Sequence, residues 1–419
     1  MADYDVIVVG AGLAGLTCAL RLQEEGLQVK LLEATDRVGG RLRSDREDGF
    51  IFDHGFHVFL TAYPEIKEWL DEPGLQLRAF KSGSFIRYRG RVSRISDPWR
   101  DPNGILGTLL SGAGSLRDKF NIGKYRKDVL ASDLKQIYFS ENISALESLR
   151  NRGFSRRIIE RFFRPFFGGI FLETELKTSR RVMDFVFKMF SEGDAALPKR
   201  GIAAIPGQLE ARLKPEVLSL KTEVFEIEPG RVELAHGDSL TAGSIAVAVP
   251  FSVVGTLVKG MVFPRRSWQG TTCLYYEAPR SPLAEPMLYL NGEGEGLINS
   301  ICVPSDVQPS YAPEGKSLIS VSIIGDYAEK EIRGKVEPDL REWFPDDFPD
   351  WNFLRSYSIP RALPRQFVSD MEPVERIEAL EPGFYMCGDH RQTSSIQGAM
   401  ASGRRTAEAL IKERRLTAD

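Results

Sequence analysis

Short apolar runs bounded by turn-forming residues recur along the chain and predict buried strands. Residues 4–9 form the first run, residues 27–32 the second, and residues 384–387 the last. Runs of this length between turn signals are typical of strands, and the valine-rich first run is typical of a parallel sheet. Residues 16–22 then place apolar side chains at helical spacing, which predicts a helix directly after the first strand. This strand-helix-strand order predicts an α/β fold.

The middle of the chain continues the pattern in distinct blocks. A strand meander is expected at residues 223–228, 231–234 and 244–250. Further strands are expected at residues 272–276, 287–290 and 318–324. By contrast, residues 81–200 read as largely helical.

The turn after the first strand has the pattern Gly-x-Gly-x-x-Gly. Gly10 allows the tight turn, Gly12 lets the backbone approach a pyrophosphate, and Gly15 lets the helix pack closely on the strand. Glu33, which lies 18 residues after Gly15, is placed to accept hydrogen bonds from ribose hydroxyls. A glycine turn without a ligand is the alternative, but the strand, helix and acid together favour a dinucleotide. The predicted contacts are Gly10, Ala11, Gly12, Leu13, Ala14, Gly15, Glu33 and Ala34.

A second glycine loop follows the ribose-binding acid and indicates FAD rather than NAD. The segment 37–41 reads Arg-Val-Gly-Gly-Arg, which supplies a loop near the diphosphate and a cation to balance its charge. It resembles the second fingerprint of the flavin amine oxidase superfamily. That resemblance implies cofactor contacts at Arg37, Gly39, Gly40 and Arg41.

The C-terminal segment supplies the other half of the predicted site. The strand at 384–387 ends on Gly388 and Asp389, and a serine N-cap then precedes a helix rich in small residues. In the resembling superfamily the aspartate holds the ribityl chain or the pyrophosphate, and this helix points its N-terminus at the flavin. The small residues suit either a close approach to the ring system or ordinary helix packing. The predicted contacts are Gly388, Asp389, Ser395, Ile396 and Ala399.

The resemblance also implies how the chain is divided. We expect a Rossmann-type FAD-binding domain, of the glutathione-reductase-like amine oxidase type, interleaved with an α+β substrate domain. The first would comprise residues 1–80, 201–265 and 356–419, and the second residues 81–200 and 266–355. In the superfamily the valine that matches Val224 contacts the adenine through its backbone.

The segment 49–64 indicates a branch of the superfamily. It looks like the matching segment of plant-type phytoene and zeta-carotene desaturases and of hydroxysqualene dehydroxylases, as does the Ser-Ile-Gln-Gly-Ala sequence at 395–399. The resemblance places Gly55, Phe56 and His57 near the flavin. We treat His57 as the candidate catalytic residue, with a purely structural histidine as the alternative.

Amine oxidases are the nearest competing branch. Many of them place a lysine near flavin N5 and an aromatic residue at the start of the last helix. The matching positions here are read as Thr272 and Ser395, and both departures weaken the amine oxidase interpretation.

These motifs predict an FAD-dependent oxidoreductase, a dehydrogenase or desaturase. The expected substrate is hydrophobic and isoprenoid-like, with hydride transfer to flavin N5 and reoxidation by a quinone or oxygen. An amine oxidase or a protoporphyrinogen oxidase-like enzyme is an alternative within the same fold. A flavin-dependent isomerase without net redox change is another, and so is a flavin-binding protein without catalysis.

Composition excludes several other classes. The 419 residues are 42% hydrophobic and carry a net charge of −3, which gives no general attraction to nucleic acid. The four cysteines lie scattered in apolar contexts, as expected for buried thiols in a reducing compartment, and no metal site is predicted. The first strand begins at once, so no targeting peptide is expected, and the apolar stretch 245–258 is too short to span a membrane. A cytoplasmic protein is expected, of undetermined oligomeric state.

One segment raises the question of a peripheral membrane contact. Residues 150–171 combine six arginines with clustered phenylalanines. This combination suits a membrane surface or the entrance of a hydrophobic tunnel. It equally suits a core helix with a solvated basic face, so both interpretations stay open.

Overall fold

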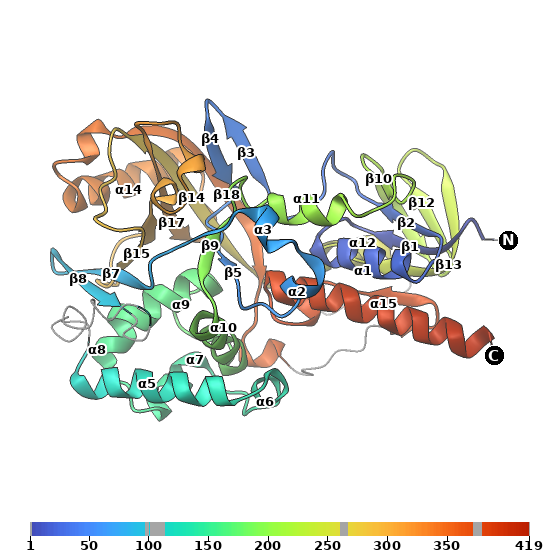
Figure 1. Ribbon diagram of the computed structural model, residues 1–419, viewed down its shortest axis with the longest axis horizontal. Helices are drawn as coiled ribbons and strands as arrows, with labels where there is room; N and C mark the ends of the chain where they lie inside the picture. Colours follow the sequence, from blue (N-terminus) through green and yellow to red (C-terminus); the bar gives the residue numbers. More distant parts are fainter. Residues whose placement is uncertain (1, 97–99, 101–113, 260–266, 372–378, 419) are drawn as a thin grey trace.

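The computed structural model describes residues 2–96, 100, 114–259, 267–371 and 379–418. Its two large sheets occupy opposite ends of an elongated molecule, and a group of helices lies beside the second sheet (Figure 1). The eight strands of the first sheet are β1 (Tyr4–Val9), β2 (Val29–Leu32), β10 (Leu218–Ser219), β11 (Val224–Glu228), β12 (Arg231–Leu234), β13 (Ser239–Val247), β19 (Ala379–Glu381) and β20 (Phe384–Met386).

Strand β13 joins the parts of the first sheet. Its second half lies parallel to both β1 and β20, so that Val247 is paired with Val9 on one side and with Met386 on the other. Its first half is antiparallel to β12, which continues the sheet into β11. The strands expected at the two ends of the chain are therefore confirmed, and they lie in one sheet together with the expected meander.

The second sheet has the order β18-β14-β17-β16-β15-β7-β8. Its seven strands are β7 (Gly83–Tyr88), β8 (Arg91–Ser96), β14 (Trp268–Ala278), β15 (Leu288–Asn291), β16 (Ile298–Cys302), β17 (Ser317–Ile324) and β18 (Asn352–Pro364). All neighbouring pairs are antiparallel except β15 and β7. This pattern confirms the strands expected between residues 272 and 324.

Two smaller sheets lie between the large ones. One is the hairpin of β3 (Ser44–Glu47) and β4 (Phe50–Asp53), and the other joins β5 (Phe59–Leu60), β9 (Ala195–Leu197) and β6 (Arg78–Ala79). The hairpin turns at Asp48 and Gly49, whose φ values of 50° and 82° are those of a tight two-residue hairpin turn.

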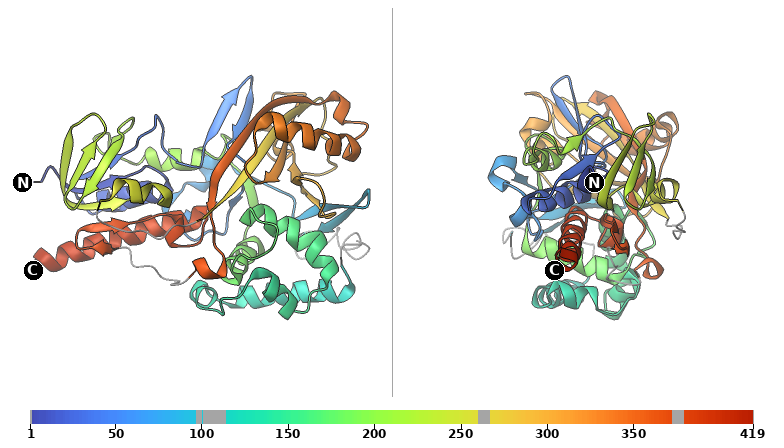
Figure 2. Two further views of the ribbon diagram at one scale, coloured as in Figure 1. Left: turned by 180° about the vertical axis from the view of Figure 1, so that it is seen from behind. Right: turned by 90° about the vertical axis from the view of Figure 1, so that its right-hand side faces the viewer.

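The helices divide between the two ends of the molecule. Helices α1 and α15 run side by side below the first sheet, whereas α5 to α10 form the helical group beside the second (Figures 1 and 2). The α-helices of the described chain are α1 (Leu13–Glu24), α2 (Ile66–Trp69), α3 (Glu72–Leu75), α5 (Leu116–Ala131), α6 (Leu134–Tyr138), α7 (Ala145–Asn151), α8 (Arg156–Ile158), α9 (Arg164–Phe171), α10 (Arg180–Glu192), α11 (Ala204–Glu210), α12 (Phe251–Leu257), α13 (Pro304–Val307), α14 (Glu329–Trp343) and α15 (Ile396–Ala418). A π-helical segment, η2 (Ile159–Phe163), joins α8 to α9, and the 3-10 segments are η3 (Pro309–Tyr311), η4 (Phe348–Asp350), η5 (Val368–Asp370) and η6 (Asp389–Arg391).

One sequence expectation needs correction. The block 81–200 is mostly helical, but it opens with the β7–β8 hairpin, whose strand β7 pairs with β15 and so extends the second sheet. The many arginines of this hairpin interrupt the apolar pattern from which a strand is predicted. Strand β18 crosses the domain limit expected at residue 356, and the limit expected at 265 lies outside the described residues, so the domain division stays a prediction.

Helices α1 and α15 approach each other closely because small residues meet between them. A Cβ atom added at Gly403 would lie 2.1 Å from the carbonyl oxygen of Ala14 and 2.2 Å from Oγ1 of Thr17. Thr17 also donates a hydrogen bond to the carbonyl oxygen of Met400 across this contact. The small residues of the last helix therefore serve helix packing at this position.

We expect Gly403→Ala to lower the free energy of unfolding by about 1–3 kcal/mol, because the added methyl group forces the two helices apart. Gly334→Ala is the matched control, since Gly334 lies in helix α14 and no atom lies within 4 Å of its added Cβ. That substitution should instead stabilise by about 0.5–1 kcal/mol. Urea unfolding measures both. Equal stability changes in the two variants would contradict the packing argument.

Candidate cofactor site

Two glycines of the first glycine turn are tightly packed, and the third has open surroundings. Gly10 has a φ of 102°, and an added Cβ atom there would lie 3.0 Å from the carbonyl oxygen of Ala248. An added Cβ at Gly15 would lie 1.8 Å from the carbonyl oxygen of Gly10. At Gly12 an added Cβ would meet no atom within 4 Å. Gly10 and Gly15 are thus required by the protein itself, whereas Gly12 leaves space where a diphosphate would approach.

The start of helix α1 offers an anion site beside that space. Gly12 is the N-cap residue, no side chain caps it, and the first turn contains no acidic residue. Leu13, Ala14 and Gly15 follow as the first residues of the helix. Their backbone N–H groups and the positive end of the helix dipole favour a negative ligand.

Glu33 stands at the end of β2 beside the same turn. One of its carboxylate oxygens accepts a hydrogen bond from the backbone N–H of Ala11 at 2.8 Å, and the other accepts one from the backbone N–H of Thr35 at 2.9 Å. The acid is therefore fixed next to the glycine turn, as a ribose-binding acid must be. Ala34 lies between these two contacts in the chain.

Val224 enters the neighbourhood through the chain just before β11. The backbone N–H of Thr222 donates to the carbonyl oxygen of Glu33 at 2.8 Å, and that of Lys221 donates to Thr35 at the same distance. Val224 is the buried first residue of β11, two positions further on. Val224 thus follows closely on a segment that is bonded to Glu33 and Thr35, and its contact with the adenine stays a prediction.

The second glycine loop lies directly against the first. The backbone N–H of Gly39 donates to the carbonyl oxygen of Ala11 at 2.8 Å. An added Cβ at Gly40 would lie 3.4 Å from the Cα atom of Gly12. The two loops therefore pack against each other beside Gly12.

An ion pair connects the N-terminal and C-terminal halves of the site. Arg41 donates to the carboxylate of Asp389 at 2.7 Å and to the carbonyl oxygen of Ala362 at 3.1 Å. Asp389 is buried, and the guanidinium lies 5.5 Å from the ring centre of Trp268. Arg41 thus holds together three segments that are far apart in the sequence.

The C-terminal helix α15 begins seven residues after Asp389, the acidic member of this ion pair. Gly388, with a φ of 150°, donates its backbone N–H to the hydroxyl of Ser402 at 3.1 Å. Ser395 caps the helix by accepting from the backbone N–H of Gly398 at 3.0 Å. Ile396 and Ala399 are half-buried in the first turn. The predicted serine N-cap is therefore confirmed.

The Gly55–His57 turn lies at the edge of the second sheet. Gly55 has a φ of 90°, and an added Cβ there would lie 3.0 Å from Cδ1 of Ile359 and 3.8 Å from Cγ2 of Thr271. Phe56 packs edge-on against Phe80 with ring centres 6.2 Å apart. The turn is thus clamped between β14, β18 and the segment that follows β6.

His57 forms a hydrogen bond with a backbone carbonyl group, and nearby charges change its pKa. Its Nε2 lies 3.0 Å from the carbonyl oxygen of His54. Because a carbonyl only accepts, Nε2 carries a proton and the Nδ1 of the neutral ring is an acceptor. Burial lowers the pKa of His57, while the nearby carboxylate of Asp53 acts in the opposite direction and Arg41 adds to the lowering. The ring is therefore neutral near neutral pH.

Asp53 is the buried anchor of this turn. Its carboxylate accepts hydrogen bonds from Oγ of Ser44 at 2.6 Å, the hydroxyl of Tyr311 at 2.8 Å and the backbone N–H of Ile202 at 3.0 Å. Burial raises the pKa of Asp53 against the effect of these hydrogen bonds. Asp53 thus ties the β3–β4 hairpin to the rest of the molecule.

The residues around this site fit FAD. Three polar atoms beside these segments are buried and have no hydrogen-bond partner within the described residues: Nε of Arg37, Nε1 of Trp268 and Nε2 of Gln392. All three are donors, and the phosphate, hydroxyl and carbonyl oxygens of FAD are acceptors. Together with the open side of Gly12, these donors indicate a bound group rich in oxygen.

Sequence reasoning missed several residues that the fold brings to the site. Trp268, Thr271, Gln392 and Asp45 belong to no motif that we recognised in the sequence. The Asp-Gly pair at 48–49, flanked by extended segments, was a usable hairpin signal that would have placed Asp45 on a strand.

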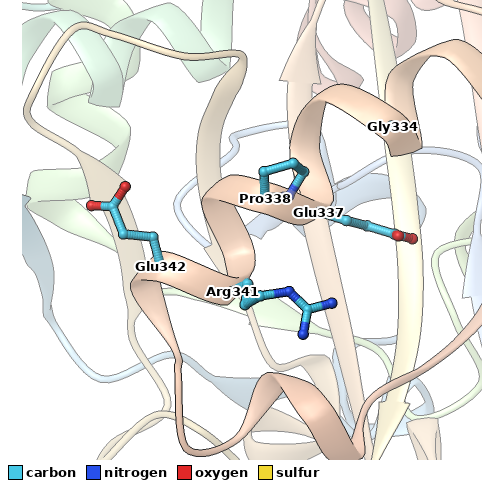
Figure 3. A pocket seen from close by; sticks show the side chains of 5 residues that line it. All are labelled: Gly334, Glu337, Pro338, Arg341 and Glu342. Atoms are coloured by element: carbon cyan, nitrogen blue, oxygen red, sulfur yellow. The ribbon is translucent and has the colours of Figure 1, made fainter.

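Two other features carry no cofactor chemistry. A hollow on helix α14 is lined by Gly334, Glu337, Pro338, Arg341 and Glu342 (Figure 3). Its two carboxylates already pair with arginines, one with Arg333 and one with Arg87. Among the residues that the structure describes, no group of three or more His, Cys, Asp and Glu is arranged to hold a metal ion.

The sequence model of one protein family matches almost the whole chain. The family is described as flavin containing amine oxidoreductase, and the match covers residues 13–411. The chain belongs to this family. The superfamily, the α/β fold class, the FAD cofactor and the oxidoreductase class predicted from the motifs are thereby confirmed.

The relatives of this flavin-containing oxidoreductase have names that describe different activities. It is 22% identical to the 15-cis-phytoene desaturase of Narcissus pseudonarcissus over 98% of this chain and 80% of that one. It is 32% identical to protoporphyrinogen oxidase 2 of Arabidopsis thaliana over 39% of this chain, a match that spans only 32% of that relative. A crystal structure provisionally described as a protoporphyrinogen oxidase from Exiguobacterium sp. 255-15 has a TM-score of 0.75 and 18% identity, covering 99% of this chain and 100% of that chain. At that identity the last likeness shows the fold alone.

We expect Gly12→Ala to lower the affinity of this oxidoreductase for FAD at least about tenfold, because the methyl group points into the space where the diphosphate approaches. The apoprotein should lose less than about 1 kcal/mol of stability, since no atom lies within 4 Å of the added Cβ. Titration of apoprotein with FAD measures the affinity. Gly207→Ala in α11, with equally open surroundings, is the control. An unchanged affinity in Gly12→Ala would contradict the assignment of this turn.

Proposed function

We propose that this oxidoreductase is a dehydrogenase or desaturase that acts on a hydrophobic, isoprenoid-like substrate. Bound FAD would accept a hydride at N5, and a quinone or oxygen would then take the electrons. The protein's own part would be to bind the substrate, orient one C–H bond and exclude water. The observation that carries this proposal is the set of side chains that faces the Gly55–His57 turn.

Those side chains are uncharged where an amine oxidase would place a lysine. Thr271, which faces Gly55, donates its hydroxyl to the carbonyl oxygen of Ile323 at 2.8 Å. Thr272 points to the other face of β14, where it donates to Gly325 at 2.9 Å and accepts from the backbone N–H of Tyr327. Neither hydroxyl can replace a lysine ammonium group. This supports oxidation of a carbon chain over oxidation of an amine.

Half-buried apolar side chains adjoin the predicted flavin-facing segments. Val58 and Ala62 follow His57, while Ile396 and Ala399 form the first turn of α15. All four pack against the same apolar core, and their accessible parts suit a hydrophobic substrate. The named relatives include a phytoene desaturase, which agrees with this substrate class.

His57 is the residue that we propose to touch the flavin or the substrate. Its Nε2–H is committed to the carbonyl oxygen of His54, which leaves Nδ1 as a neutral acceptor. Hydride transfer from an apolar chain needs no acid–base pair of the protein, and the proton lost from the neighbouring carbon would pass to the reduced flavin or to water. We therefore propose that His57 orients its partner and takes no part in proton transfer.

Protoporphyrinogen oxidase chemistry is the second candidate, because a named relative shares 32% identity over part of the chain. A flavin-dependent isomerase differs from both oxidoreductases because it would turn over without an electron acceptor. A flavin-binding protein without catalysis would hold flavin that no substrate reduces.

Anaerobic addition of candidate substrates to the purified flavoprotein tests this proposal. We expect an isoprenoid polyene or a squalene derivative to bleach the flavin absorbance, and amines to leave it unchanged. Bleaching by porphyrinogens alone would establish the second candidate. Bleaching by amines would contradict the argument from Thr271. Turnover without any acceptor would establish the isomerase.

A contact with a membrane surface is the second part of the proposal. None of the helices in the described part of the chain has the length and apolar character that a membrane span requires. The phenylalanines at 163, 167 and 171 are buried and stack in the core, so these three side chains are not available to a membrane. We propose that a cytoplasmic enzyme of this kind touches the membrane through α5 and α6 instead.

Helices α5 and α6 combine exposed apolar side chains with positive charge. Leu116 is 70% exposed, Phe120 is 74% exposed one turn later, and Phe139 directly after α6 is 60% exposed. Residues 116–139 contain six lysines and arginines but three aspartates, in a chain whose net charge is −3. Exposed apolar side chains in a segment with an excess of cations suit an anionic lipid surface.

Sedimentation with phosphatidylglycerol vesicles at low salt tests this surface. We expect the enzyme to bind these vesicles, and to bind less at high salt, since the charges are exposed. A Leu116→Ser, Phe120→Ser double variant should bind at least about tenfold more weakly, because two apolar side chains no longer leave water. Phe225→Ser is the control, as Phe225 is 65% exposed on β11 in the first sheet. Absence of binding by the unaltered enzyme, or an equal loss in the control, would count against this surface.

A further inference from the structure

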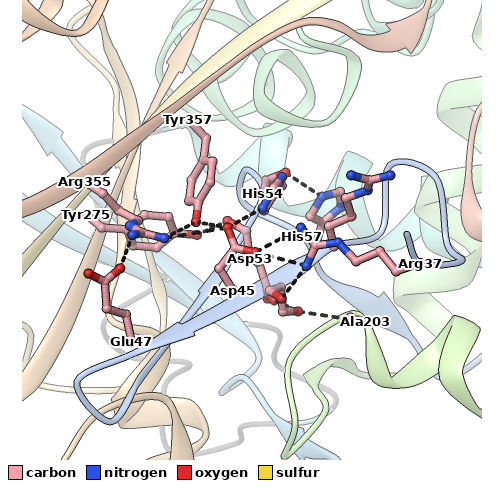
Figure 4. A network of polar contacts seen from close by, with 12 residues as sticks. Arg37, Asp45, Glu47, Asp53, His54, His57, Ala203, Tyr275, Arg355 and Tyr357 are labelled. Atoms are coloured by element: carbon pink, nitrogen blue, oxygen red, sulfur yellow. Dashed lines mark hydrogen bonds and ion pairs between the residues drawn. The ribbon is translucent and has the colours of Figure 1, made fainter. Parts of the chain in front are cut away.

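A single carboxylate in the β3–β4 hairpin joins three segments that surround the cofactor site. Asp45 lies on β3 with its two oxygens turned toward different partners (Figure 4). Oδ1 accepts two hydrogen bonds from the guanidinium of Arg37, each of 3.1 Å. Oδ2 lies 2.7 Å from Nε2 of His54 and accepts from the hydroxyl of Tyr357 at 2.8 Å.

The partners of Asp45 belong to separate parts of the fold. Arg37 opens the second glycine loop, which faces the first glycine turn. His54 precedes the Gly55–His57 turn. Tyr357 belongs to β18 of the second sheet. One side chain therefore connects the loop at the expected diphosphate, the turn at the expected flavin ring and the sheet of the expected substrate domain.

The imidazole of His54 has little freedom in this arrangement. Besides the contact with Asp45, its ring stacks on Tyr357 with centres 4.3 Å apart and an interplanar angle of 28°. Its backbone N–H donates to the carbonyl oxygen of Arg43 at 2.9 Å. The carbonyl group of His54, which accepts the Nε2–H of His57, is fixed as a result.

Asp45 is charged near neutral pH. Partial burial opposes ionisation, but the hydrogen bonds from His54, Tyr357 and Arg37 outweigh it and lower its pKa to about 2. Ionisation is therefore lost only in strong acid, as the pH falls through that value.

We propose that Asp45 is a positioning residue that couples FAD binding at the glycine loops to the orientation of His57. Both of its carboxylate oxygens are occupied by protein side chains. Its oxygens hold Arg37 on one side and His54 on the other, so a disturbance of one segment reaches the other through rigid, charge-assisted hydrogen bonds. This inference rests on the proposed function in one point, that His57 faces the flavin.

Asp45→Asn is the test, because the amide keeps the shape of the side chain but turns a donor toward Arg37 or His54. The guanidinium of Arg37 can only donate, so the amide oxygen has to face Arg37 and the amide NH2 group faces His54 and Tyr357. The charge that holds Arg37 is then lost, and His54 keeps its contact only in the tautomer whose Nε2 accepts. We expect the dissociation constant for FAD to rise about tenfold. Glu47→Gln is the matched control, since Glu47 lies on the same strand and contacts neither Arg37 nor His54; its partner Arg355 lies 3.6 Å from Oδ2 of Asp45 and stays in place. It should change the affinity less than twofold.

A second measurement observes His57 directly. The chain contains four histidines, so ring nitrogen signals of a protein labelled with [15N]histidine can be assigned by substitution. We expect the His57 signals to report an Nε2–H tautomer in the unaltered holoenzyme and an average of tautomers in Asp45→Asn. Glu47→Gln should leave these signals in place.

Tyr357→Phe is a second variant, which keeps the proposal testable if Asp45→Asn does not fold. It removes one hydroxyl from Asp45 and keeps the stacked ring, so the same two measurements should change in the same direction by a smaller factor. A lower melting temperature with unchanged FAD affinity and unchanged His57 signals, in both variants, would overturn the proposal. Neither measurement requires turnover, so a failure of the proposed substrate class leaves this test intact.

Discussion

Strand β13 is the constraint on which the cofactor site depends. It lies between β1 and β20, and the chain continues this pairing past its end, where Ala248 donates to Val9 and Cys387 donates to Val247. Because all three strands are parallel here, their carboxyl ends meet at the same edge of the sheet. The glycine turn after β1 and the Gly-Asp pair after β20 arrive there together, although more than 370 residues separate them.

Two ion pairs connect this edge of the sheet to other segments of the chain. The second glycine loop carries an arginine at each end, and each is held by a different carboxylate: Arg41 by Asp389, and Arg37 by Asp45. The first pair connects the two chain ends, and the second connects the loop to the β3–β4 hairpin. The loop is thereby held from both sides, while the uncapped start of α1 is left to attract the diphosphate.

The Gly55–His57 turn is the place where the cofactor site and the second sheet meet. The turn contacts β14 through Thr271 and β18 through Ile359, both uncharged. Arg41 also reaches β18 at Ala362. These uncharged contacts from β14 and β18 beside the neutral ring of His57 suit chemistry in which the cofactor supplies the reactivity and the protein supplies the shape.

Much of the cofactor half of the molecule could be predicted because its signals are local. The Gly-x-Gly-x-x-Gly turn, Glu33 and the serine cap of α15 each depend on backbone geometry within a few residues, and the structure has them where they were expected. Other interpretations could not be decided locally. The small residues of α15 were compatible with a flavin or a helix, and contact with Ala14 assigns Gly403 to the helix. The phenylalanines at 163, 167 and 171 were compatible with membrane or core, and their stacking assigns them to the core.

The sequence by itself determined the fold class, the cofactor type and the ends of the chain that hold it, because glycine turns and apolar periodicity are written in neighbouring residues. Only the tertiary structure decided the role of residues such as Asp45, a polar side chain on a short exposed strand whose sequence context predicts solvent. Its partners Arg37, His54 and Tyr357 come from three segments, the most distant of which lies 312 residues from Asp45 in the chain. A hydrogen bond depends on distance in space, and distance in space between such segments is set by the packing of sheets and not by their order in the chain.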